Sequence, residues 1–291
     1  MIIGHNKQWQ YLLKSKETGR LSHAYLFCGQ EKLGKKKLAL ELISLLFGQD
    51  ISKTSHPDLT LIEPEGKEIQ IGQIKQLIWN LSLKPYSAPL KVALIDRAHL
   101  MNEEAQASLL KTLEEPKGET LLVLVSEEPK YLLPTIVSRV QTIKFYPVAR
   151  EEITSYLTAE GLGKEESEEL FKISLGSPGL AVDYAADPQR LGAFKKKESE
   201  FAEISKSALH SRFQYAKNLS EDPKNLKDTL DVWISYLREV LLLKVKTGKE
   251  EGGYSVSKLK TILLLIQDIN YLILNTNVNS RLALEKLMTE L

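Results

Sequence analysis

Short runs of β-type residues alternate with helical patterns over the first half of the chain. The runs cover residues 23–28, 58–62, 91–96, 120–125 and 141–145. Between them, apolar residues recur at the three- and four-residue spacing of a helix, as at Leu38, Leu42 and Leu45. Strands that alternate with helices are typical of a parallel sheet with crossover helices on its faces. We therefore predict an α/β domain with five mostly parallel strands.

The pattern changes after Pro147, where the strand-like runs end. Residues 151–187 show short helical stretches that glycine-rich segments interrupt at 161–163 and 176–179. From Pro188 onward the apolar spacing indicates longer helices. We predict three domains, which are an α/β domain over residues 1–147, a small helical domain over 148–187 and an all-helical domain over 188–291.

Composition and charge narrow the class of protein. Hydrophobic residues make up 43% of the 291 residues and charged residues 26%, which is ordinary for a folded soluble protein. Lys and Arg number 39 against 38 Asp and Glu, so the overall charge predicts neither a nucleic-acid nor a membrane surface. The single cysteine, Cys28, can form no internal disulfide, and no apolar stretch approaches the ~20 residues of a membrane span. We expect a cytoplasmic protein without a membrane partner.

The first candidate site follows the first β-run. Residues 29–35 read Gly-Gln-Glu-Lys-Leu-Gly-Lys and match the G-x-x-x-x-G-K core of a P-loop between a strand and a helix. In such loops backbone N–H groups from Gly29 to Gly34 cradle phosphates, and Lys35 reaches the outer phosphates. The next residue should be Ser or Thr, to bind Mg²⁺, but this chain has Lys36. An ammonium group has no lone pair to offer a metal ion, so the usual magnesium ligand is missing.

A second candidate site lies at the end of the third β-run. Asp96 ends that run, where P-loop NTPases place an acidic residue on the metal side. ATPases of this kind follow it with a Glu that polarises the attacking water, whereas this chain has Arg97, which cannot act as a base. We interpret His99 as a packed or capping imidazole and not as a catalyst. Two chemical roles are therefore missing, and we expect no hydrolysis by the chain alone.

Several segments together resemble a known family. They are residues 22–27, 95–102, 109–116, 133–139 and 277–285. In this order they are similar to segments of the AAA+ clamp-loader subunits of bacterial DNA polymerase III, over essentially the whole chain. The resemblance implies an AAA+ P-loop domain, a helical lid over residues 148–187 and a helical collar over 188–291 that assembles with sister subunits into a pentamer.

The departures from the family pattern are informative as well. Its ATP-hydrolysing members carry Ser or Thr after the P-loop lysine, Glu after the acidic residue and an arginine in the lid. This chain has Lys36, Arg97 and Gly-Ser-Pro-Gly-Leu at residues 176–180. Many relatives also hold a four-cysteine zinc module, but residues 47–58 contain no cysteine, and His56 alone cannot form a tetrahedral site. We expect no zinc and no bound cofactor, with at most weak binding of ATP or ADP.

Ser138 and Arg139 are the candidate residues for chemistry. In the family a Ser-Arg pair usually precedes Cys, and here Val140 takes that place. The resemblance implies that Arg139 acts in trans, as an arginine finger that reaches the γ-phosphate of ATP held by a neighbouring subunit. The alternative is an arginine that caps the end of its own helix. Ser126, at the end of the fourth run, is a weaker candidate for a polar sensor of the γ-phosphate.

We therefore predict a subunit of the DNA polymerase III holoenzyme, a DNA-directed DNA polymerase, that has no intrinsic catalysis and serves as a stator in DNA replication. The resemblance implies gamma/tau and delta subunits as partners, with the sliding clamp and primer–template DNA reached through the complex. Two alternatives stay open. Lys36 and Arg97 count against a gamma/tau-type ATPase, and the helical third domain counts against a P-loop kinase or small-molecule transferase.

Overall fold

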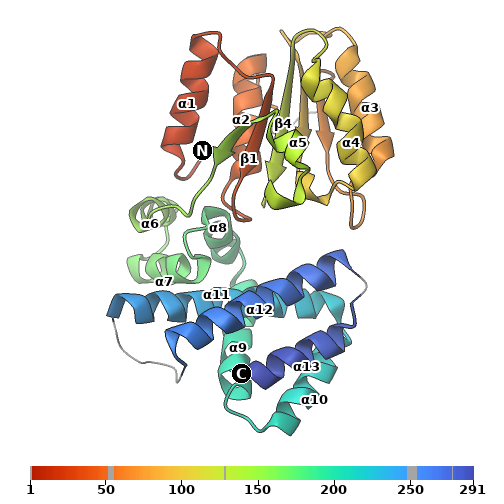
Figure 1. Ribbon diagram of the computed structural model, residues 1–291. Helices are drawn as coiled ribbons and strands as arrows, with labels where there is room; N and C mark the ends of the chain where they lie inside the picture. Colours follow the sequence, from red (N-terminus) through yellow and green to blue (C-terminus); the bar gives the residue numbers. More distant parts are fainter. Residues whose placement is uncertain (1, 52–55, 128, 248–253, 277) are drawn as a thin grey trace. The chain divides into compact units, whose positions relative to one another are not determined.

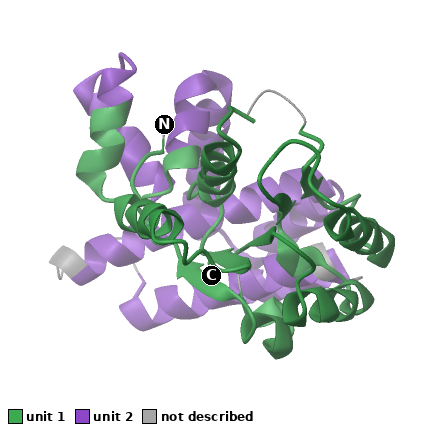
Figure 2. Cartoon of the chain, turned by 90° about the horizontal axis from the view of Figure 1, so that it is seen from above, with its two compact units in different colours: residues 1–156, 176–179 green, residues 157–175, 180–291 purple. Residues whose placement is uncertain are grey.

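The computed structural model describes residues 2–51, 56–127, 129–247, 254–276 and 278–291. The described chain forms two compact units (Figure 2). Unit 1 comprises residues 1–156 together with 176–179, and unit 2 comprises residues 157–175 and 180–291. The short segment 176–179 therefore belongs with the α/β part of the chain, although the residues on both sides of it belong to unit 2.

Unit 1 contains a five-stranded sheet in which every pair of neighbours is parallel. The strands are β1 (Ala24–Cys28), β2 (Leu59–Ile62), β3 (Lys91–Ile95), β4 (Thr120–Ser126) and β5 (Gln141–Lys144). Their order across the sheet is β2-β3-β4-β1-β5, which confirms the predicted fold class. Because the carboxyl ends of parallel strands share one edge, the loops after β1, β3 and β4 converge there.

Helices cover both faces of this sheet (Figure 1). They are α1 (Asn6–Glu17), α2 (Lys35–Phe47), α3 (Ile71–Ser82), α4 (Glu103–Glu114) and α5 (Pro134–Val137), with short 3₁₀ turns η1 (Ala98–Leu100) and η2 (Pro129–Tyr131). Successive residues of β1 point to opposite faces. Tyr25 and Phe27 join one core with Leu38 of α2, while Leu26 joins the other core with Leu109 of α4. This alternation explains why the strands are apolar at nearly every position.

A buried carboxylate fixes the loop that leads into β3. The side chain of Asp58 accepts hydrogen bonds from the backbone N–H groups of Tyr86, Ser87 and Ala88, at 2.7 to 2.9 Å. Its Oδ1 also lies 2.9 Å from Nζ of Lys91. Burial by itself raises the pKa of Asp58, but the backbone donors and Lys91 outweigh it and hold that pKa far below its ordinary range. The carboxylate therefore stays charged and anchors the loop at the edge of the sheet.

The described secondary-structure elements of unit 2 are all helices. It contains the end of α6 (Arg150–Ala159), α7 (Lys164–Ser174), most of α8 (Pro178–Ala186), α9 (Pro188–Ile204), α10 (Leu209–Ser220), α11 (Pro223–Thr247), α12 (Val256–Asn275) and α13 (Ser280–Glu290). Trp233 of α11 is fully buried, and its ring centroid lies 5.0 Å from that of Phe201 and 6.0 Å from that of Tyr215. Among the described residues, no helix is both long and apolar enough to span a bilayer.

The predicted domain boundaries fall between elements. The boundary at 147/148 precedes α6, and the boundary at 187/188 separates α8 from α9, whose first turn is capped by Asp187. Within unit 2, α7 packs on α11, so a helix of the predicted lid shares a compact unit with the predicted collar. The division of the chain into three domains therefore stays a prediction.

Candidate functional site

Two glycines shape the loop after β1. Gly29 has a φ of 146°, and a Cβ at this position would lie 2.4 Å from the backbone oxygen of Phe145. Gly34, with a φ of 89°, precedes the first residue of α2 in the left-handed conformation. Both backbones favour glycine because a side chain would clash or be strained. The G-x-x-x-x-G-K pattern thus produces a tight turn between β1 and α2, where the sequence places a P-loop.

The loop lysine faces its own loop. Lys35 is 6% exposed, and its Nζ donates to the backbone oxygens of Gly29 and Gln30, each at 2.6 Å. Burial lowers the pKa of Lys35, and the nearby carboxylates of Glu127 and Glu31 oppose that shift. The ammonium group therefore satisfies carbonyl groups within the loop.

Lys36 forms an ion pair with the acidic residue after β3. Its Nζ lies 3.1 Å from Oδ2 of Asp96, and it donates a hydrogen bond to Oε1 of Glu63, the residue that follows β2. Partial burial lowers the pKa of Lys36, but hydrogen bonds to Glu63 and Asp96 outweigh it, so the pKa is raised. The same hydrogen bond from Lys36 lowers the pKa of Glu63. Loops after three strands thus meet around one ammonium group.

The residues after Asp96 make different contacts. Arg97 is exposed, has a φ of 51°, and its backbone N–H donates to Oδ1 of Asp96 at 3.0 Å. The Nδ1 atom of His99 accepts from the backbone N–H of Glu127 at 3.4 Å and lies 3.5 Å from Oγ of Ser126. Burial, together with the positive charges of Lys35 and Arg97, lowers the pKa of His99 to about 4. The neutral imidazole accepts hydrogen bonds, as a packed or capping histidine does.

The glycine-rich segment 176–179 packs directly on this loop. The backbone N–H of Gly179 donates to the oxygen of Lys32 at 2.9 Å, and a Cβ at position 179 would lie 2.8 Å from that oxygen. Gly176 has a φ of 80° and accepts from the N–H of Val148 at 2.8 Å. Position 179 therefore leaves no room for a side chain against the loop. The sequence pattern indicated a missing lid cation here but did not predict this contact.

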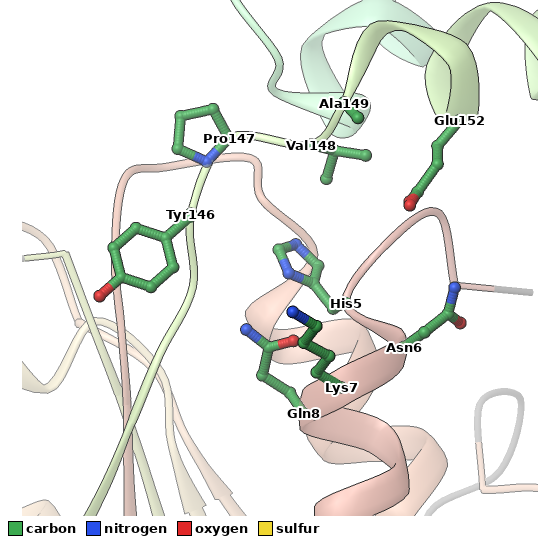
Figure 3. Close-up of a pocket in the computed structure, with 9 residues that line it drawn as sticks. All are labelled: His5, Asn6, Lys7, Gln8, Tyr146, Pro147, Val148, Ala149 and Glu152. Atoms are coloured by element: carbon green, nitrogen blue, oxygen red, sulfur yellow. The ribbon is translucent and has the colours of Figure 1, made fainter.

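A surface pocket of about 270 Å³ lies beside the loop. Figure 3 shows that its lining comes from the start of α1, from the connection between β5 and α6, and from Glu152 in the first turn of α6. The Nε2 atom of His5 lies 2.8 Å from the oxygen of Leu33, which ties the start of α1 to the loop. Burial lowers the pKa of His5. The sequence did not indicate this pocket, because its lining residues lie far apart along the chain, at 5–8 and at 146–152.

Arg139 lies two residues beyond the short helix α5. Its Nη1 donates to the backbone oxygen of Thr135 at 2.9 Å and to Oγ of Ser138 at 3.2 Å. Its Nη2 lies 2.7 Å from Oε1 of Glu114, the last residue of α4. The guanidinium group caps its own helix, as the alternative interpretation proposed, and its side chain nevertheless keeps 36% of its surface exposed. Glu114 lies in a segment that carried the family resemblance, but the sequence did not indicate this pairing.

A buried glutamine joins α4 to the segment before α5. Nε2 of Gln106 donates to the backbone oxygens of Met101 and Tyr131 at 3.0 and 3.2 Å, and its Oε1 accepts from the N–H of Leu133 at 2.7 Å. These bonds fix the entrance to α5 and therefore the position of Arg139. Among the described residues, no group of three or more His, Cys, Asp or Glu side chains is placed to hold a metal ion. Residues 52–55, part of the cysteine-free segment 47–58, lie outside the described chain.

The fold and the site together define a P-loop protein of the AAA+ class. The sheet is parallel, a loop with the P-loop sequence pattern follows β1, and an acidic residue follows β3. The profile of the family described as DNA polymerase III, delta subunit, matches residues 4–149. The chain belongs to this family of clamp-loader subunits, and its curated relatives point to the delta-prime type.

Three relatives and one solved structure illustrate the match. DNA polymerase III subunit delta' of Bacillus subtilis is 30% identical over 272 residues, which cover 89% of this chain and 74% of that protein. The delta' subunit of Pseudomonas aeruginosa is 35% identical over 193 residues, which cover 58% of each chain. Subunit gamma/tau of Mycoplasma genitalium is 26% identical over an alignment that covers 90% of this chain and 48% of that protein. A gamma subunit-related protein of Thermotoga maritima, 20% identical, aligns with a TM-score of 0.49 over 96% of this chain and 97% of its own.

Proposed function

We propose that this chain is a non-hydrolysing, delta-prime-like subunit of the DNA sliding-clamp loader in chromosomal replication. In this role it is a structural stator that donates Arg139 as an arginine finger to the ATP site of a neighbouring subunit. Its partners are gamma/tau and delta subunits, and it meets the sliding clamp and primer–template DNA through the complex. Family membership supports the assembly, and the contacts of the altered P-loop support the loss of hydrolysis.

The position of the Lys36 ammonium group is the observation that carries this proposal. Mg²⁺ in P-loop NTPases takes oxygen ligands, including a hydroxyl after the loop lysine. Here that position supplies a cation, and the cation is already paired with Asp96 and Glu63. A second positive ion at the same carboxylates would face direct repulsion. These residues therefore do not fit a magnesium–nucleotide, and hydrolysis through one is not part of the proposed role.

The other contacts of the loop are also made within the chain. The ammonium group of Lys35 is occupied by two carbonyl groups of its own loop. The N–H of Gly179 donates to the backbone oxygen of Lys32, and the two backbones are too close for a side chain at position 179. Arg97 supplies no base where an ATPase of this kind has Glu. Since a general base is typically worth about 10² to 10⁴ in rate, this loss alone supports inactivity.

The environment of Arg139 supports the donated finger. A guanidinium group is a permanent planar cation, suited to stabilise the charge that spreads over phosphate oxygens during transfer. The side chain is partly exposed and follows a four-residue helix whose entrance Gln106 fixes. A residue at the end of a rigid element, with solvent on one side, can reach a site on another subunit.

Apolar side chains on unit 2 support assembly through its helices. Large exposed residues occur on α11 and α12, among them Leu242, Val245, Leu264 and Tyr271. Contiguous exposed apolar patches are typical of protein–protein contacts, and a contact through these side chains is part of the proposal. A gamma/tau-type ATPase is the second candidate, because proteins of that name match most of this chain, but Lys36 and Arg97 disfavour it.

The test is the ATPase activity of the purified chain, with gamma/tau from the same cell as the positive control. We expect no hydrolysis above background, with or without DNA and clamp, because the loop lacks a metal ligand and a base. Nucleotide binding should be weak or undetectable by fluorescence titration with labelled ADP. A turnover on the order of 1 s⁻¹, at the low end of ordinary enzymes, would contradict the proposal.

A further inference from the structure

Glu114 and Arg139 join the ends of two helices that are separate in the sequence. Glu114 is the last residue of α4, and Arg139 follows α5. The Nη2 atom of Arg139 lies 2.7 Å from Oε1 of Glu114. On its other side, Nη1 donates to the backbone oxygen of Thr135 and to Oγ of Ser138. The guanidinium group is therefore held from two directions.

The carboxylate that holds Arg139 sits on a rigid element. Leu109 and Leu113 of α4 are buried in the sheet core, and the helix start is capped by the side chain of Asn102, which accepts from the N–H of Ala105 at 2.9 Å. The backbone oxygen of Leu113, next to Glu114, lies 3.0 Å from Nε2 of His23. These contacts fix the end of α4, and hence the origin of the Glu114 side chain, relative to the sheet.

The ion pair orients Arg139, and it is exposed enough that the guanidinium group stays accessible to a partner. The side chains are 36% exposed for Arg139 and 49% exposed for Glu114. An exposed ion pair of this kind shifts an equilibrium by at most about fivefold. A long arginine side chain otherwise samples many rotamers, which must be restricted when it binds phosphate. A carboxylate that restricts them beforehand reduces that cost, as preorganisation does in other active sites.

We propose that Glu114 is a positioning residue for Arg139. Its carboxylate holds the guanidinium group in the orientation needed to contact the phosphate that a neighbouring subunit binds. The inference rests on the proposed function of Arg139 as a finger acting in trans. Glu115 provides a matched comparison, because it is the next carboxylate, is exposed, and forms no ion pair within the described chain.

The experiment uses the complex reconstituted with the gamma/tau and delta subunits of the same cell. The variants are Glu114→Ala, Glu114→Gln, Glu115→Ala, Arg139→Ala and the double variant Glu114→Ala with Arg139→Ala. Thermal unfolding and gel filtration first establish that each variant folds and assembles. The readouts are the clamp-loading rate and the kcat and KM for ATP.

We expect Glu114→Ala and Glu114→Gln to lower the clamp-loading rate by about two- to fivefold, which is the size of an exposed ion pair. The kcat should fall while KM is unchanged, since an interaction realised in the transition state is lost. Glu115→Ala should match the wild type. In the double variant, loss of Glu114 should add nothing to the loss of Arg139, because the carboxylate acts through the arginine.

Two results would overturn the inference while leaving the proposed function intact. One is normal clamp loading by both Glu114 variants when Arg139→Ala is impaired. The other is a double variant whose loss equals the product of the two single losses, which would give Glu114 an independent role. If Arg139→Ala itself loads clamps normally, the finger is wrong, and the positioning role falls with it.

Discussion

Position 36 holds a lysine where P-loops have Ser or Thr, and its ammonium group pairs with carboxylates of the same chain. The ammonium group joins Asp96 and Glu63, so the loops after β1, β2 and β3 are held together by an ion pair. The sequence indicated that Lys36 removes a metal ligand. It did not indicate Glu63, because a single acidic residue after a strand has no pattern that distinguishes it from other surface carboxylates.

Asp58 gives a residue-scale test of stability. Because its carboxylate is buried and paired with Lys91, we expect Asp58→Asn to lower the free energy of unfolding by about 3 to 5 kcal/mol. The exposed substitution Glu115→Gln should change it by less than about 0.5 kcal/mol. Urea unfolding of the two variants and the wild type measures both. A loss below about 1 kcal/mol for Asp58→Asn would mean that the carboxylate is not an anchor.

The same residue should make stability depend on pH. The pKa of Asp58 in the folded chain lies well below the unfolded value of about 3.9. Its contribution is therefore complete above about pH 4 and is lost as pH falls toward the folded pKa. The stability difference between the wild type and Asp58→Asn should shrink below about pH 4. A difference that stays constant to lower pH would contradict this account.

At the scale of elements, the sequence predicted the strands closely and the polar contacts poorly. Four of the five predicted β-runs contain an observed strand, and β4 extends one residue beyond the remaining run, to Ser126, because short runs of β-type residues are a local signal. Arg139 lies two residues beyond α5, which ends at Val137 after four residues. Gln106 and Glu114 act across elements, and periodicity alone carries no information about such pairings.

The exposed face of α12 gives a test at this scale. Leu264 is 52% exposed, and we expect Leu264→Asp to weaken assembly with gamma/tau and delta because a charge would be buried at a contact. The matched control is Thr289→Asp, an exposed polar position on α13 and therefore outside the face of α12 that carries Leu264. Both variants should keep the thermal stability of the wild type. Affinity measured by gel filtration over a concentration series distinguishes them, and equal assembly of the two variants would exclude this face of α12 from the contact.

At the scale of the whole molecule, the chain has two compact units where the sequence predicted three domains. The helical nature of residues after Pro147 was correctly predicted, since the apolar spacing there and the family resemblance both indicate helices. The sequence did not predict that residues 176–179 belong to unit 1. A glycine pair that permits close backbone contact cannot be distinguished in sequence from one that ends a helix. Family membership rests on the family match over residues 4–149 and on the delta' relatives, and the ordered set of motifs made the resemblance recognisable from the sequence.

The central claim is that this chain completes the ATP site of another subunit although its own site is inactive. The most direct measurement is clamp loading and steady-state ATP hydrolysis by the reconstituted complex with Arg139→Ala or Arg139→Lys. Gel filtration should first confirm normal assembly. An arginine finger supplied in trans is worth about 10³ to 10⁵ in rate at the site that it serves.

We expect Arg139→Ala to lower clamp loading by about tenfold or more, since loading needs the sites to act in concert. Total ATP hydrolysis should fall by a smaller fraction, since other sites keep their own arginine fingers. Arg139→Lys should be nearly as impaired, because a point charge does not replace the planar fork. Normal clamp loading by a fully assembled complex with Arg139→Ala would contradict the account and leave the guanidinium group as a cap for α5.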